Sequence, residues 1–584
     1  MTEEANSQLR LTRDLGDRGP SLSQRLSDRL DRLSFASPFH RMRLKGRYPL
    51  KLVAVPEDPI PGDPAIGQRL KGGRLFRDGY GQGMLEARLD APDAPASWRQ
   101  WVHGWGWLRD LAAVEELNAS EIRRAEALAK RWLAHYHEYD EEGWEPSATG
   151  RRVLMACLHA PLVMPGHDHI HRSAVLNGIA RWARHLERAA PRMQPGIGKL
   201  EALAGLVGSA LILPGGDERH GRAEALLGEA LAALLAEDGS ALARSPLELA
   251  RIGDLMLTLS AFHAARAHRP SPLIARTLEQ VRTGLGMLSM GDDQPSPWHG
   301  GQPSRAQLRR LGVQPIPQPP GKGSGFQRLS AGTLTLMMDA GPPPPTRVST
   351  QAHASTLAFT LTDGKRSLIV SCGGGQGEGG VRQLPAELAM GLRSTAGHST
   401  LVLADTNSSR LPDGGPRKLG GVEEVLVDAR SSLEGHWLEG RHDGWRRRFG
   451  VDHLRRLWMS PDGTDLRGED QLIPSGRGLA LNRPKGPLPV AIRFHLGPGA
   501  TATPTQDGRG ALVVLPGARA GQDIAWAFRT SFNHAPGKLS IEPSLFLDSE
   551  GVIHEIQQIL LTTLLEPGAT GDVSWSFKRQ VKAG

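Results

Sequence analysis

The sequence predicts a multidomain α + β protein, with a helical N-terminal domain followed by a large antiparallel β-sandwich. Three observations predict this fold. Helical periodicity fills the first half, a stretch rich in Pro, Gly and Gln interrupts it, and short apolar or alternating runs fill the remainder. Helices followed by strands are typical of segregated α and β layers. With 39% hydrophobic and 23% charged residues among 584, the composition is that of a globular protein.

The first 34 residues are highly charged and predict a mobile N-terminal tail, with room for one amphipathic helix in SLSQRLSDRLDRL. This segment lacks the apolar core of a secretory signal. No run of 18 apolar residues occurs anywhere, so no membrane-spanning helix is expected. By default, these features predict a cytoplasmic protein.

Residues 35–290 are predicted to form the helical domain. Residues 47–99 carry many Pro and Gly, which favours extended and turn structure there. From about residue 100, apolar residues recur at i, i+3, i+4 and i+7, which predicts amphipathic helices separated by short breaks. Helices joined in this way pack antiparallel, as an incomplete α/α toroid or an irregular bundle.

Residues 291–325 are predicted to be a linker because of their Pro, Gly and Gln content. Residues 326–584 are predicted to form the β-sandwich, since their short strand-like runs end at Gly-containing turns. The Asp-Gly pairs that start at Asp363, Asp462 and Asp507 indicate hairpin turns.

The chain has a net charge of +8 and a pI of about 9.7, which favours anionic partners. Nucleic acid is an unlikely partner, because aromatic residues make up only 5% and no dense basic block is interleaved with them. Nucleic-acid binding through the basic surface is kept as a weaker alternative. Cys157 and Cys372 are far apart and outside any CxxC motif, so neither a disulfide framework nor a zinc ribbon is expected.

The β half carries motifs that resemble a known family. The segments GFQRLSAGTLTLMMDAG, QAHASTLAFTLTDGKRSLIVSCG and STAGHSTLVLAD place His353-Ala354-Ser355 and His398-Ser399-Thr400 after strand-like runs. Their order and spacing resemble the β-domain of the heparinase II/III family of polysaccharide lyases. The helical segments HGWGWLRDL, GRRVLMACLHAP and DGSALARSPLELARIGDLM are similar to its N-terminal toroid. The resemblance covers roughly residues 35–580 and implies the toroid rather than the bundle.

The resemblance implies cleavage of a uronate-containing, glycosaminoglycan-like polysaccharide by β-elimination, at a cleft between toroid and sandwich. Such a site needs a base for the C5 proton, an acid for the leaving O4 and a group that neutralises the carboxylate. His353 is the candidate base, and His398 is its orienter or a second ligand of a possible zinc. The candidate groups for binding the anionic substrate are Lys199, Arg393, His442 and Arg446.

Two residues of the family site are missing from the helical half. The segment that should carry the family tyrosine corresponds to residues 239–248 and has none, and the family asparagine would fall near Lys199. A third zinc ligand would fall at Ser371, and serine is a poor zinc ligand. A non-catalytic protein that binds an anionic polysaccharide or acts as a scaffold therefore stays open. The family function implies the periplasm, whereas the N-terminus implies the cytoplasm.

Overall fold

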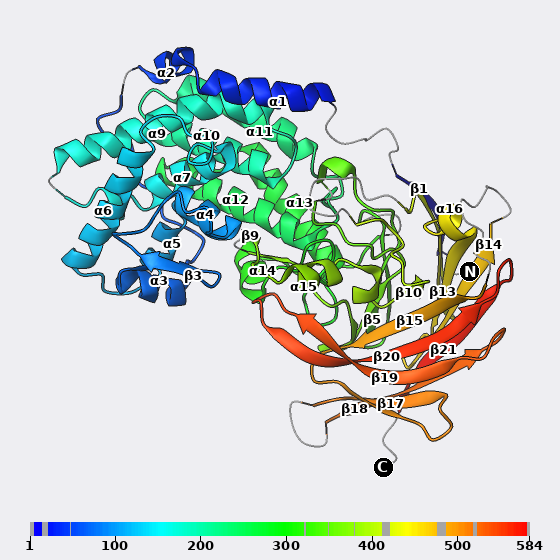
Figure 1. The fold of residues 1–584 in the computed structure, drawn as a ribbon. Coiled ribbons are helices and arrows are strands. Elements are labelled where there is room, and N and C mark those ends of the chain that lie inside the picture. The colour runs from blue at the N-terminus through cyan, green and yellow to red at the C-terminus, as the bar shows by residue number, and fades with distance from the viewer. Residues whose placement is uncertain are drawn as a thin grey trace.

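A computed structural model of the chain describes residues 5–580, except 14–21, 47, 167, 320–322, 349, 379, 412–420, 476–485 and 518–521. Figure 1 shows helices on one side and a two-layer β structure on the other. The predicted architecture, an incomplete α/α toroid followed by an antiparallel sandwich, is confirmed.

Several helices of the first half begin at residues whose side chains cap them. Asn118 and Glu121 form a reciprocal capping box at the start of α6, and Ser245 caps α12 with Pro246 in its first turn. The helices preceding the sandwich are α1 (Leu22–Phe35), α2 (Pro38–Leu44), α3 (Pro64–Lys71), α4 (Ala96–His103), α5 (Trp107–Ala112), α6 (Ala119–His135), α7 (Pro146–Leu158), α8 (Ala160–Val163), α9 (His169–Ala189), α10 (Ile197–Ile212), α11 (Asp217–Ala232), α12 (Pro246–Ala265), α13 (Pro272–Leu288) and α14 (Arg305–Leu311).

One layer of the sandwich is, in the described part of the chain, a nine-stranded antiparallel sheet in the order β1-β11-β12-β13-β14-β21-β18-β17-β16. Its strands are β1 (Ala5–Thr12), β11 (Glu424–Ser432), β12 (Gly435–His442), β13 (Val451–Met459), β14 (Asp465–Pro474), β16 (Thr501–Pro504), β17 (Gly510–Leu515), β18 (Ile524–Phe532) and β21 (Gly571–Gln580).

The second layer has, over the same described residues, eight strands in the order β19-β20-β15-β7-β6-β5-β4, with β10 paired to β15. Its strands are β4 (Phe326–Ala331), β5 (Leu334–Asp339), β6 (Phe359–Asp363), β7 (Arg366–Val370), β10 (Leu401–Leu403), β15 (Leu488–Leu496), β19 (Lys538–Leu547) and β20 (Ile553–Leu565). Small pairs are formed by β2 (Arg74–Arg77) with β3 (Tyr80–Gly83) and by β8 (Gln376–Gly377) with β9 (Gly380–Val381), and α15 (Ala386–Gly391) and α16 (Arg446–Phe449) are short helices in loops.

A single apolar core joins the two layers. Leu336 and Phe359 of one sheet share a buried cluster with Leu457 and Trp575 of the other. Phe359 stacks on Trp575 with ring centroids 5.5 Å apart. The hairpins predicted at Asp363, Asp462 and Asp507 are confirmed, since they join β6 to β7, β13 to β14 and β16 to β17.

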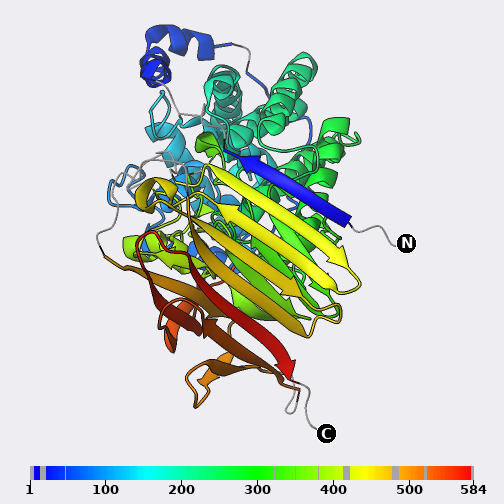
Figure 2. The same ribbon diagram turned by 90° about the vertical axis from the view of Figure 1, so that its right-hand side faces the viewer.

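The N-terminus differs from the mobile tail expected over residues 1–34. Strand β1 pairs antiparallel with β11 along its whole length and becomes the edge of the nine-stranded sheet (Figure 2). Leu9 packs against the sandwich core, and Arg10 pairs with Glu424. The partner strand lies more than 400 residues away in the sequence, so local charge content did not reveal the pairing. Residues 14–21 lie outside the described part.

In the segment expected to be a linker, residues 291–325, the stretch 295–304 is buried or half-buried. Trp298 is fully buried in a small apolar cluster with Leu288, Phe326 and Met337. Within the same segment, α14 docks on α12 through Arg310, whose guanidinium donates to Asp254 at 2.9 and 3.0 Å. The Pro and Gly content therefore corresponds to irregular backbone in this segment. The segment is packed in place by the buried side chain of Trp298.

Among the described residues, no helix combines the length and apolar character that a bilayer crossing requires. Cys157 and Cys372 are both buried free thiols.

Candidate functional site

A cleft of about 590 Å³ lies where the helical half meets the sandwich. Its helical wall comes from α1, α9, the starts of α10 and α12, and the loop that follows α6. Its opposite wall comes from His299, the loop 347–352 and Gln376. The resemblance to the heparinase II/III family placed the expected site at this boundary, so the cleft is the candidate site.

Glu248 is the acidic side chain in this cleft with the most perturbed ionisation. It lies in the first turn of α12, where its backbone N–H donates to the Ser245 hydroxyl at 3.3 Å. Burial raises the pKa of Glu248 to about 7, against the opposing charge of Arg251. A carboxyl with this pKa exchanges a proton near neutral pH, as a general acid or base must.

Several cations share the cleft with Glu248. Lys199, Arg251 and Arg347 all line it. The Lys199 ammonium donates to the carbonyls of Pro191 and Met193 at 3.0 and 3.2 Å, and burial lowers its pKa. An anionic ligand would therefore meet positive charge close to a proton-exchanging carboxyl.

A tyrosine also lines the cleft, although residues 239–248, the segment expected to carry the family tyrosine, contain none. Tyr139 enters from the loop after α6 and lies beside His185, with ring centroids 5.7 Å apart. His185 contacts the Trp144 carbonyl at 3.0 Å, and burial lowers its pKa to about 3. Tyr139 is thus a phenol that lines the cleft, and it comes from a different part of the helical half than residues 239–248.

Asp339, at the end of β5, is the buried link between the two halves. Its carboxylate pairs with Arg244, which precedes α12, and accepts from the Ser355 hydroxyl at 2.6 Å. Although burial opposes ionisation, Arg244 holds the pKa of Asp339 well below its usual range. His299 Nε2 lies 3.3 Å from the same carboxylate. Asp339 therefore anchors the helical half to the sandwich.

The two predicted catalytic histidines are adjacent but fully buried. The rings of His353 and His398 lie 5.1 Å apart between centroids, and the two side chains are 1% and 0% exposed. His353 Nε2 accepts from the Gly300 backbone N–H at 2.9 Å, and the backbone N–H of His353 donates to His299 Nδ1 at 3.2 Å. Burial lowers the pKa of both imidazoles, that of His398 to about 3. Of this trio, only His299 lines the cleft.

The same pair of histidines is where the resemblance implies a possible zinc ion. Both ring nitrogens of His398, His353 Nδ1 and Ser371 Oγ are buried without a hydrogen-bond partner among the described residues. A protein zinc site takes at least three His, Cys, Asp or Glu ligands, and among the described residues no group of three with ligand atoms close enough to share an ion includes His353 or His398. The residues at this position therefore do not fit the metal.

Arg393 supports the His353 loop from outside the cleft. Its Nε donates to the Ala352 carbonyl at 3.0 Å, and its own carbonyl accepts from the Ala354 N–H at 2.9 Å. Arg393 is not among the residues that line the cleft. Its contacts are those of a residue that fixes the loop.

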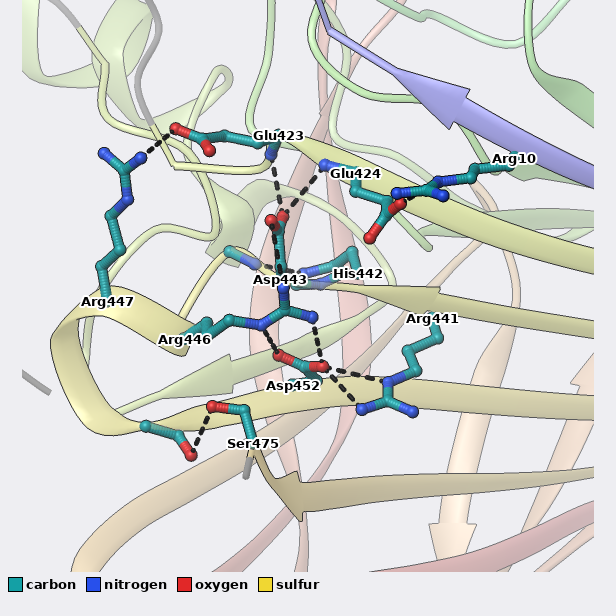
Figure 3. Close-up of polar contacts among 12 residues, drawn as sticks. Arg10, Glu423, Glu424, Arg441, His442, Asp443, Arg446, Arg447, Asp452 and Ser475 are labelled. Carbon is teal, nitrogen blue, oxygen red and sulfur yellow. Dashed lines mark hydrogen bonds and ion pairs between the residues drawn. The ribbon is translucent and has the colours of Figure 1, made fainter. Parts of the chain in front are cut away.

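The structure separates His442 and Arg446 from the cleft. Both line another hollow, of about 440 Å³, on the nine-stranded sheet (Figure 3). There Arg446 and Arg441 both donate to Asp452, at distances of 2.7 to 3.0 Å. Asp452 is fully buried, so its carboxylate needs these donors. The ion pair with Asp452 keeps Arg446 in this hollow. His442 is buried against His453, with a nitrogen–nitrogen distance of 3.3 Å.

Among the six residues predicted as the site, Lys199 alone lines the cleft. Sequence reasoning missed Glu248, Arg251, Tyr139 and Arg347. The only local signal was the helix start Ser-Pro-Leu-Glu, which predicts an acidic side chain at an exposed helix N-terminus rather than in a cleft.

The chain is similar to known proteins both in sequence and in fold. The family description "Heparinase II/III-like, C-terminal" matches residues 314–576. The chain is 30% identical over 569 residues to FtsZ-localized protein C of Caulobacter vibrioides, covering 94% of each protein. Its fold is similar to a crystal structure of heparinase III, with a TM-score of 0.66, 11% identity and coverage of 86% and 80%. It is also similar to heparan sulfate lyase HepC of Pedobacter heparinus, with a TM-score of 0.59, 12% identity and coverage of 94% and 88%.

Proposed function

The chain belongs to the heparinase II/III family, and on that basis we propose that it binds a uronate-containing polysaccharide in the interdomain cleft and cleaves it by β-elimination. The observation that carries the proposal is Glu248, a carboxyl with a pKa of about 7 that shares the cleft with Lys199 and Arg347.

The base is assigned to Glu248 rather than to His353. A base must reach the substrate, and Glu248 lines the cleft whereas His353 is 1% exposed with its Nε2 already accepting from Gly300. A pKa near the working pH gives the best compromise between the unprotonated fraction and the strength of the base. Glu248 meets both conditions at neutral pH.

The cations supply the charge neutralisation that the chemistry needs. Paired with Lys199 or Arg347, the C6 carboxylate of a uronate makes the C5 proton more acidic and stabilises the enolate-like state. The Glu248 carboxylate takes the C5 proton, the electron pair forms the C4–C5 double bond, and the C4–O4 bond breaks. The departing O4 takes a proton from the Tyr139 hydroxyl, which is restored from solvent.

Ultraviolet absorbance of the unsaturated product tests this proposal on heparin, heparan sulfate, chondroitin and alginate. The wild type should produce the chromophore from at least one polymer, and Glu248→Gln should lower that rate at least about 100-fold. Tyr139→Phe should lower it as well. Glu279→Gln is the matched control, because Glu279 is 71% exposed on α13. Equal rates for Glu248→Gln and the control would contradict the assignment of the base.

The second candidate is a non-catalytic scaffold that localises with FtsZ. It is favoured by the match to FtsZ-localized protein C, which extends over 94% of both chains. The missing family asparagine and the buried histidine pair are consistent with a fold kept for binding.

Co-sedimentation with FtsZ polymers, together with the chromophore assay, separates the two candidates. A lyase forms product whether or not FtsZ is present. A scaffold pellets with the polymers and forms no product from any polysaccharide in the panel, and Glu248→Gln leaves its pelleting unchanged.

A further inference from the structure

Away from the cleft, three potential metal ligands meet between α11 and α12. His220 and Glu224 occupy i and i+4 positions on α11, so they share one helix face, and His263 projects from the last turn of α12. Each offers one ligand atom, and these atoms all lie within 4.8 Å of one another. The two imidazole rings lie 5.4 Å apart between centroids.

The three side chains share a second property. His220 Nε2, Glu224 Oε1 and His263 Nε2 are each buried and have no hydrogen-bond partner among the described residues. His263 as a whole is only 5% exposed. Leaving a buried polar atom unsatisfied costs about 1–3 kcal/mol, so three at one point need a common explanation. A bound cation would give all three a partner.

We propose that His220, Glu224 and His263 bind a zinc ion that clamps α11 to α12. Two imidazoles and one carboxylate are a ligand set that zinc accepts, with a fourth position left for water. Magnesium and calcium prefer all-oxygen sites and are disfavoured by the two imidazoles.

The site is independent of the proposed lyase chemistry. Glu248 lies at the start of α12 and His263 near its end, so about 22 Å of helix separates them. The zinc joins two neighbouring helices and does not touch the cleft. It also lies apart from His353 and His398, where the resemblance implied a metal.

The test uses the full-length protein without a histidine tag, stripped with chelator and then titrated with Zn²⁺ in a calorimeter. One equivalent should bind with micromolar or tighter affinity, and the melting temperature should rise on binding. Co²⁺ should give the visible absorption of a tetrahedral nitrogen–oxygen site, and Mg²⁺ should produce no heat. Absence of tight zinc binding by the wild type overturns the proposal.

Substitutions of the proposed ligands test where the zinc ion binds. Glu224→Gln and His220→Gln should each weaken zinc binding at least tenfold and abolish the rise in melting temperature. Their helical circular dichroism in chelator should match that of the wild type. His268→Ala, an exposed histidine just beyond α12, is the matched control and should retain the zinc. If His398→Ala loses the ion while both α11 variants keep it, the proposal is wrong.

Discussion

Glu248 should couple proton binding to folding. Burial raises its pKa from 4.5 to about 7, so the folded protein holds the proton more tightly than the unfolded chain does. The stability that this group contributes is fully present below pH 4.5 and is lost as the pH rises through about 7. Glutamine resembles the neutral acid and does not titrate.

Glu248→Gln should therefore match the wild type near pH 4.5 and become more stable as the pH rises, by at most about 3 kcal/mol above pH 7. Urea unfolding of both proteins at pH 5 and pH 8 measures the difference, in which the other titrating groups cancel. A difference that does not change between the two pH values would contradict the perturbed pKa.

Removing the charge of Asp339 should destabilise the contact between the two halves. Asp339→Asn leaves the Arg244 guanidinium buried without its counter-ion, which costs about 3–5 kcal/mol. The control Asp428→Asn removes an ion pair with Arg430, whose side chain is 60% exposed. This change should lower the free energy of unfolding by less than about 1 kcal/mol. Denaturant unfolding compares the two, and similar losses would argue against a central role for Asp339.

At the scale of elements, α7 and α10 approach through glycine. A Cβ at Gly150 would lie 2.2 Å from the Glu201 carbonyl oxygen, and one at Gly205 would lie 2.5 Å from the Gly150 Cα. Because both contacts are to backbone, the helices cannot accommodate a methyl group without separating. The helical periodicity predicted both helices, but it carried no sign of this contact.

Gly150→Ala should destabilise the protein by about 1–3 kcal/mol. Gly228→Ala in α11 is the matched control, because its Cβ would meet only Leu273 at 3.5 Å. That change should be neutral or stabilising by up to about 1 kcal/mol, since alanine is the better helix former. Thermal unfolding of the two variants should show shifts of opposite sign, and a parallel decrease would refute the close approach.

Elements with a local signal could be predicted from the sequence. The capped helix α12 and the Asp-Gly hairpins depend on neighbouring residues, and they appear where the sequence placed them. Strand β1 could not be predicted, because its partner β11 lies more than 400 residues away. The buried loop around Trp298 likewise depends on packing between the two halves rather than on its own composition.

The whole molecule should lose stability in mild acid. Burial is the largest cause of a lowered pKa at five buried histidines, each of which falls to about 3 or 4: His40, His103, His185, His398 and His495. The unfolded chain binds their protons near pH 6.5, whereas the folded protein does not. Their stabilising contribution is therefore present above pH 6.5 and is lost as the pH falls toward 4.

Urea midpoints measured from pH 7 to pH 4 should fall steadily for this reason. The buried carboxylates Asp339 and Asp470 add their own loss only below about pH 4, the ordinary range of an aspartate. A midpoint that stays constant down to pH 4 would contradict the neutral state of the buried histidines.

The site could be predicted only in part, because it is assembled from distant segments. The resemblance pointed to the boundary between the halves, where the cleft lies, and charge pointed to Lys199, which lines it. Tyr139 and Arg347 come from loops on opposite sides of that boundary, so no single stretch of sequence contains their relationship. His353 and His398 have the residue types of a catalytic pair, but both are buried beside the segment that joins the two halves, and burial lowers the pKa of each imidazole.

The binding of a defined uronate oligosaccharide by calorimetry tests the central claim, that the interdomain cleft is the saccharide site. Lys199→Ala/Arg347→Ala should weaken binding at least tenfold because both cations line the cleft. Arg441→Ala removes a cation from the separate hollow but leaves Arg446 on Asp452, so it should bind like the wild type. Weakened binding by Arg441→Ala with an unchanged cleft variant would contradict the account.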